Sequence, residues 1–138
     1  MSQEYIPAAV RAAANGQCSY CRSQSSNSGS PLQFEHILAL AVGGLTVFAN
    51  LCMACWPCNL RKGTMTRAPD QQTGEVVALF HPRQQQWSEH FAWDESGTLI
   101  LGLTPVGRAT IQALQLNHEL LVQARHTWVR AGTHPPVD

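Results

Sequence analysis

Five cysteines carry the clearest chemical signal in this 138-residue chain. They are Cys18, Cys21, Cys52, Cys55 and Cys58. An odd number of cysteines, in a chain whose first residues lack the pattern of a secretory signal, argues against a disulfide framework. The C-x-x-C pairs Cys18/Cys21 and Cys55/Cys58 can each direct two thiolates to one ion from a tight turn. The spacing therefore predicts a structural Zn²⁺ site of four thiolates, with no open position for a substrate.

Two other interpretations of the cysteines stay open at this point. Cys52-Met-Ala-Cys55 also has the C-x-x-C spacing, so it could supply the second pair instead. We prefer Cys55 and Cys58, because residues 50–54 have the pattern of an extended segment that leads into a proline-containing turn. The remaining alternative is a set of buried thiols or a redox pair. If zinc is bound, the stability of the front half should depend on the metal.

The elements around the cysteines can be predicted coarsely. Residues 32–38 alternate in polarity like a strand, Gly43-Gly44 marks a loop, and Asn50–Ala54 is a second short strand. Residues 58–63 are typical of a short helix ended by glycine. Polar residues that could do chemistry fall on these elements: Glu35, His36, Asn50, Asn59 and Lys62.

The ordered set of motifs resembles the ββα-metal motif of HNH endonucleases, in the variant of that fold that is clamped by cysteines. The resemblance rests on Phe34-Glu-His-Ile, Gly43-Gly44, Asn50-Leu51, Cys55-x-x-Cys58-Asn59 and Lys62-Gly63. Motifs further along are similar to a group of small bacterial, notably cyanobacterial, HNH proteins. They are Asp70-Gln-Gln-Thr-Gly-Glu, Leu79-Phe-His-Pro-Arg-Gln, Trp87-Ser-Glu-His-Phe, Gly102-Leu-Thr-Pro and Gly107-Arg-Ala-Thr.

The resemblance implies a metal-dependent endonuclease that hydrolyses DNA, with catalytic residues His36, Asn50 and Asn59. His36 would be the general base, because a neutral imidazole can accept a proton from water near pH 7. Glu35 and the amide oxygen of Asn59 would hold Mg²⁺ or Mn²⁺, with other divalent ions left open, because hard cations prefer oxygen ligands. Asn50 would orient His36 or brace the loop; the alternative is an ordinary turn residue.

The sequence departs from the family pattern in two places. Many relatives have Asp where this chain has Glu35, and the proline common after the histidine is replaced by the run Leu38-Ala-Leu-Ala. Glu35 and His36 are also neighbours on a predicted strand, so their side chains leave opposite faces unless the strand twists or bends. The extra methylene of Glu35 leaves the metal distance and the choice of ion open.

Three basic residues on and after the predicted metal helix, Arg61, Lys62 and Arg67, are expected to contact phosphates. The alternative is a solvated helix end. Residues 1–69 hold five basic and two acidic side chains, whereas residues 70–138 hold four and seven, so the front half suits an anionic partner. The expected partner is DNA, and RNA stays open. The alternative function is a zinc-knuckle nucleic-acid- or protein-binding module without cleavage. The balance of nine Lys and Arg against nine Asp and Glu favours this alternative slightly, because a nuclease that acts alone usually gains affinity from many basic contacts to phosphates.

The rear half is expected to support this core. Strands are predicted over 75–80, 90–93 and 98–103, then a helix from Pro105 to about Leu116 with Thr104 as its N-cap. Asn117 is predicted to cap a second helix. Three tryptophans are assigned to the core rather than to base stacking: Trp87, Trp93 and Trp128.

Together these features predict one α+β domain over residues 1–138. Its zinc-clamped ββα core would span residues 18–67, and a small antiparallel sheet with two C-terminal helices would span residues 70–132. Hydrophobic residues make up 44% of the chain and charged residues 13%, which favours a folded domain over disorder. Since no apolar run reaches the about 18 residues that cross a bilayer, no membrane contact and a cytoplasmic location are expected.

Overall fold

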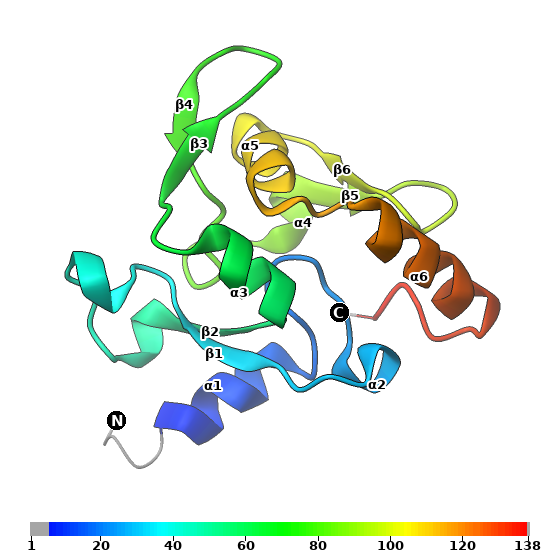
Figure 1. Cartoon of the computed structure of the whole chain (residues 1–138), viewed down its shortest axis with the longest axis horizontal. Helices are drawn as coiled ribbons and strands as arrows, with labels where there is room; N and C mark the ends of the chain where they lie inside the picture. Colours follow the sequence, from blue (N-terminus) through cyan, green and yellow to red (C-terminus); the bar gives the residue numbers. More distant parts are fainter. Residues whose placement is uncertain (1–5, 138) are drawn as a thin grey trace.

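Short helices and strands joined by loops and turns form residues 6–137, which are the residues that the computed structural model describes (Figure 1). In chain order the elements are α1 (Ile6–Ala14), α2 (Ser25–Ser28), β1 (Gln33–His36), η1 (Leu40–Val42), η2 (Phe48–Asn50), β2 (Leu51–Ala54), α3 (Trp56–Lys62), β3 (Arg67–Pro69), β4 (Val76–Ala78), α4 (Trp87–His90), β5 (Phe91–Trp93), β6 (Ile100–Gly102), α5 (Pro105–Leu114) and α6 (Glu119–Arg130). No helix among these is long and apolar enough to cross a bilayer.

The hairpin of β1 and β2 is the central feature of the front half. The strands are antiparallel, and Glu35 lies opposite Cys52. All four residues of β2 are buried, because the strand is covered on both faces. Leu51 and Met53 pack against α1, whereas Cys52 and Ala54 belong to the main core on the other face. The hairpin is therefore sandwiched between α1 and the rest of the molecule (Figure 1).

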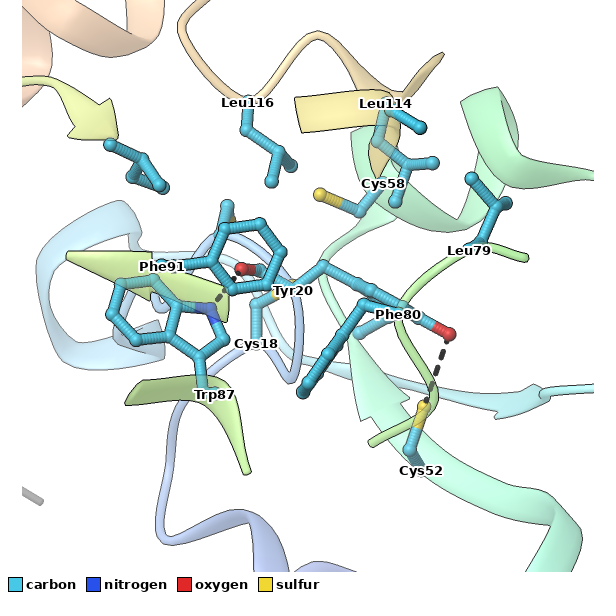
Figure 2. Close-up of a cluster of buried hydrophobic side chains, with 14 of the residues drawn as sticks. Cys18, Tyr20, Cys52, Cys58, Leu79, Phe80, Trp87, Phe91, Leu114 and Leu116 are labelled. Carbon is cyan, nitrogen blue, oxygen red and sulfur yellow. Dashed lines mark hydrogen bonds between the residues drawn. The ribbon is translucent and has the colours of Figure 1, made fainter. Parts of the chain in front are cut away.

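The main core joins the cysteine region to the rear half. Figure 2 shows Trp87 and Phe91 from the rear half packed near Cys18 and Tyr20. The indole Nε1 of Trp87 donates a hydrogen bond of 2.9 Å to the carbonyl oxygen of Tyr20. Trp87 is 7% exposed, so its prediction as a core residue is confirmed. This cluster rigidly supports the turn that carries the first cysteine pair.

The strands form three separate two-stranded antiparallel sheets rather than one small sheet. Each strand has only three or four residues, and each pair is closed on its own. Helix α5 packs against β3, β4 and β6, so a helix occupies the space where two hairpins could otherwise have joined. The α+β class with antiparallel pairing is thus confirmed, but the prediction of a single sheet is wrong.

Of the two predicted helix caps in the rear half, one is confirmed and the other is wrong. Thr104 caps α5 as predicted, since its side chain accepts a hydrogen bond of 3.1 Å from the amide of Gly107. The cap of α6 is His118 rather than Asn117. Asn117 instead bonds both the amide and the carbonyl of Ile100 at 2.8 Å, which extends the edge of β6. The structure also contains α1, which no motif in the sequence indicated. Its two buried residues are Ile6 and Val10.

Candidate functional site

Four cysteines come together at the junction of the front and rear halves. The Sγ atoms of Cys18, Cys21, Cys55 and Cys58 all lie within 4.8 Å of one another. The sulfurs of Cys21 and Cys55 are 3.6 Å apart. A tetrahedral zinc ion with Zn–S distances of about 2.3 Å needs sulfurs about 3.8 Å apart. The cluster therefore fits Zn²⁺, and it is the one such group of His, Cys, Asp or Glu side chains in residues 6–137.

Two tight turns direct the thiols inward. In the first, the amide of Arg22 bonds the carbonyl of Cys18 at 3.0 Å. In the second, Cys55 is the N-cap of α3 and Cys58 lies in its first turn, with a proline between them. Hydrogen bonds from the three other cysteines, Cys18 foremost, lower the pKa of Cys21. A readily formed thiolate is what a metal ligand requires.

Cys52 lies outside the cluster, which excludes the alternative pairing of Cys52 with Cys55. Its Sγ donates a hydrogen bond of 3.1 Å to Oε2 of Glu35 and lies 3.9 Å from the hydroxyl of Tyr20 (Figure 2). Burial and the nearby charge of Glu35 raise the pKa of Cys52 far above its ordinary value. Cys52 therefore stays a neutral thiol that satisfies a buried carboxylate.

Glu35 points from β1 toward α3 and does not face solvent. Its side chain is 3% exposed, and Oε1 lies 3.1 Å from Nζ of Lys62, which is 2% exposed. The same Nζ donates a hydrogen bond of 2.6 Å to the carbonyl of Ile37. Lys62 was expected to contact phosphates at the surface; that prediction is wrong, because the side chain is drawn inward by the buried carboxylate.

His36 leaves the opposite face of β1, as the alternation of a strand requires. The ring is half-buried, and Nε2 shares a hydrogen bond of 2.9 Å with the hydroxyl of Thr46. His36 also lines a hollow of about 400 Å³ whose other walls are mainly apolar. These walls are Ile6, Pro7, Phe34, Thr46 and Leu51. The structure thus does not bring His36 and Glu35 to a common pocket.

The two asparagines make different contacts. Asn50 ties the loop between β1 and β2: its Oδ1 accepts from the amide of Leu38, and its Nδ2 donates to the carbonyls of Leu38 and Leu45. Asn59 is half-buried, and its Nδ2 donates a hydrogen bond of 3.0 Å to Oε1 of Gln33. Because Gln33 is two residues from Glu35, Asn59 and Glu35 lie on the same side of β1.

Gln33 is the residue that sequence reasoning missed at this face. Period-two spacing from Glu35 was the available signal. The two remaining basic residues lie nearer to solvent than Lys62. Arg67 is exposed and bonds the carbonyl of Val76 at 3.0 Å, whereas Arg61 is half-buried and bonds that of Leu114 at 3.4 Å.

The fold and the four-cysteine cluster define a small α+β protein with a site suited to structural zinc. The family model described as HNH endonuclease matches residues 18–72, which span both cysteine pairs, the β1–β2 hairpin and α3. The resemblance predicted from the sequence is thereby confirmed over this segment, which is about two fifths of the chain. No curated protein and no solved structure matches the chain.

Proposed function

We propose that the protein is a metal-dependent endonuclease that hydrolyses DNA phosphodiester bonds, with β1, β2 and α3 as its ββα catalytic element. The observation that carries the proposal is the HNH match over residues 18–72, in which Glu35, His36 and Asn59 all fall between or beside the cysteine pairs. The zinc ion would have a structural role, because four thiolates leave no coordination position for water or phosphate.

His36 is the proposed general base. An imidazole has two ring nitrogens, and Nε2 shares a hydrogen bond with the Thr46 hydroxyl. In the tautomer in which Nε2 donates this bond, the lone pair is on Nδ1. That nitrogen can take the proton of the water that attacks the phosphorus. Asn50 would act through the loop, because its three hydrogen bonds hold Leu38 and Leu45, and Leu45 directly precedes Thr46. It is a positioning residue in this proposal.

Glu35 and Asn59 are the proposed ligands of a divalent ion, Mg²⁺ or Mn²⁺. Such an ion supplies Lewis-acid stabilisation of the charge on the phosphate and the departing oxygen. Two contacts support the choice: Asn59 uses its nitrogen toward Gln33, which leaves its amide oxygen for a cation, and Glu35 Oε1 accepts no well-directed hydrogen bond. Binding there requires that the cation replace Lys62 as the counter-ion of Glu35. Joint action on one phosphate also requires that β1 twist, because His36 and Glu35 leave opposite faces of this strand.

The charge of the front half supports an anionic substrate. In residues 6–69, the one acidic side chain is Glu35, and it is buried and paired. The surface of this part of the chain therefore carries basic side chains without acidic ones. DNA releases counter-ions when basic groups approach it, which favours binding at low salt. Arg61 and Arg67 are the proposed phosphate contacts on this surface.

One observation favours a second candidate, a zinc-stabilised nucleic-acid-binding module without cleavage. Glu35 is already paired with the ammonium group of Lys62 and accepts a hydrogen bond from the thiol of Cys52, and a binding protein needs no further cation there. In this alternative the buried pair is a permanent part of the core, and the match to HNH endonucleases reflects a shared fold alone.

Cleavage of supercoiled plasmid in Mg²⁺ or Mn²⁺ separates the two functions. We expect wild type to nick or linearise the plasmid, and His36→Ala to lose about 10²- to 10⁴-fold in rate, as removal of a general base does. The matched control is His126→Ala, which removes an exposed histidine of α6. Cleavage that survives in His36→Ala rejects His36 as the base. Plasmid binding without cleavage in any divalent ion supports the binding module, and a single-stranded RNA substrate tests the remaining target class.

A further inference from the structure

The loop between β1 and β2 carries an unusual set of exposed apolar side chains. We refer to residues 38–47 as the apolar loop. Its five large residues are all exposed: Leu38 at 40%, Leu40 at 60%, Val42 at 52%, Leu45 at 68% and Val47 at 41%. Thr46 is the one polar side chain of the loop, and no residue in it is charged. Five exposed large apolar side chains within ten residues indicate a contact site rather than an ordinary solvated loop.

The apolar loop is held in one shape. The amide group of Asn50 bonds the main chain of Leu38 and of Leu45, so it joins the two sides of the loop. Gly44 is packed so closely that a Cβ atom there would lie 1.7 Å from the carbonyl oxygen of Leu38. Its amide bonds the carbonyl of Ala39 at 3.0 Å. A loop fixed in this way loses little conformational freedom when it inserts into a partner.

The apolar loop lies next to the proposed general base. Thr46, which shares a hydrogen bond of 2.9 Å with His36, is flanked in sequence by Leu45 and Val47. In Figure 1 the loop extends from the end of the hairpin, away from the core that joins the hairpin to α5. A duplex whose phosphate reached His36 would therefore lie close to Thr46 and to the residues of the apolar loop beside it.

Charge around the loop favours a nucleic acid over a protein as the partner. From residue 36 to residue 69 there is no Asp or Glu. At the base of the loop, the guanidinium of Arg83 lies 4.2 Å from the ring centroid of Phe48 and donates to its carbonyl at 3.3 Å. An apolar tip beside the basic side chain of Arg83, on a segment without acidic residues, matches a groove in which stacked bases lie between two rows of phosphates.

We propose that the apolar loop is a wedge that inserts Leu40 and Leu45, the two most exposed of its five large apolar side chains, between base steps of duplex DNA. Insertion would unstack a step and bend the duplex, as apolar side chains do in proteins that deform DNA from the minor groove. The bend would bring the adjacent phosphate against His36. This inference rests on the proposed function, since it gives the nuclease a deformed duplex as its substrate and makes deformable steps the preferred sites.

The test is a binding experiment in EDTA, where cleavage is absent. A short duplex carries 2-aminopurine at several positions, and its fluorescence rises when the base unstacks. We expect wild type to raise the fluorescence, and the double variant Leu40→Ala/Leu45→Ala to lose the rise and to bind the duplex on the order of tenfold more weakly. On a duplex with a mismatch, which is already partly unstacked, the double variant should lose less affinity.

The matched control is Leu120→Ala, which removes a side chain of α6 that is also 68% exposed. Both variants should stay folded, because Leu40, Leu45 and Leu120 are at the surface. Zinc content and thermal melting verify this. A wild type that cleaves plasmid without raising the fluorescence overturns the wedge and leaves the nuclease standing. A wild type that neither binds nor cleaves DNA overturns both. A double variant that keeps unstacking but changes from dimer to monomer in light scattering overturns the wedge, because the loop is then a protein interface.

Discussion

The ammonium nitrogen of Lys62 lies 3.1 Å from a carboxylate oxygen of Glu35, and the two side chains are only 2% and 3% exposed. This pair joins the end of α3 to β1. The start of α3 is joined to residues 18–21 through the cysteine cluster. A helix of seven residues would be unstable alone. Besides its packing against α5, it is held by these two attachments, of which one requires metal and the other does not.

Removing the ammonium group of Lys62 should show how much an unpaired, buried Glu35 carboxylate destabilises the fold. We expect Lys62→Met to lower the free energy of unfolding by about 3–5 kcal/mol, because it leaves Glu35 charged and unpaired in the core. The double variant Glu35→Gln/Lys62→Met should lose less, because neither charge remains. Urea unfolding of both variants and wild type measures the difference. Equal losses in the two variants would contradict the account of the pair.

The same variants test the proposed divalent site. If Glu35 can take a divalent ion in place of Lys62, then millimolar Mg²⁺ or Mn²⁺ should raise the melting temperature of Lys62→Met in a concentration-dependent way. The double variant, which lacks the carboxylate, is the control and should not respond. A Lys62→Met protein that melts at the same temperature with and without the ions would argue against Glu35 as a metal ligand.

The cysteine cluster predicts about one Zn²⁺ per chain by elemental analysis. Cys58→Ser should lose most of the zinc and unfold at a lower temperature, because binding of a structural metal contributes directly to folding. Cys52→Ser is the matched control: a serine hydroxyl can still donate to Glu35, so this variant should keep the zinc. The reverse pattern, with zinc lost from Cys52→Ser and kept by Cys58→Ser, would contradict the assignment of ligands.

The three hydrogen bonds of Asn50 predict a local effect on the loop. Asn50→Asp keeps the acceptor for the amide of Leu38 but loses both donors, leaving two carbonyls without them. We expect a loss of about 1–3 kcal/mol in the free energy of unfolding. Amide hydrogen exchange should become faster in residues 38–50 and stay unchanged in α6. Asn27→Asp, which loses one exposed hydrogen bond to Thr133, is the control and should have a smaller effect.

A dependence on acid is expected at the turn between β3 and β4. Two hydrogen bonds of 3.0 Å from Arg108, followed by that from the Thr73 hydroxyl, hold the pKa of Asp70 well below its usual range. A lowered pKa in the folded state stabilises the fold above the unfolded pKa of about 4. That stability is lost as the pH falls from there through the folded pKa.

Asp70→Asn should therefore be less stable than wild type at pH 7. The difference in the free energy of unfolding between wild type and Asp70→Asn should shrink progressively at pH values below about 4, where wild type loses the same contribution. Urea unfolding at a series of pH values measures it. Glu75→Gln, in the same turn but with an exposed side chain, is the control. A gap between wild type and Asp70→Asn that stayed constant into strong acid would contradict the role of Arg108.

Local rules explain why some features could be predicted from the sequence. The pair Cys55/Cys58 could be assigned because two residues of spacing and a proline turn determine where both thiols point. Thr104 could be named as a cap because capping depends on its own hydroxyl and an amide three residues away. Each of these outcomes depends on a few neighbouring residues, whatever the rest of the chain does.

Only the tertiary structure decided what the polar residues of the hairpin contact. The sequence marked Glu35, His36 and Lys62 as chemically capable, and it left open whether a twist of the strand would bring Glu35 and His36 together. It did not reveal that Lys62 is buried against Glu35, or that Asn117 bonds Ile100 instead of capping α6. The partner that a polar side chain bonds depends on which groups the packing of the core brings within about 3 Å of it. That choice depends on segments far away in the chain, and it is settled only when the whole core is assembled.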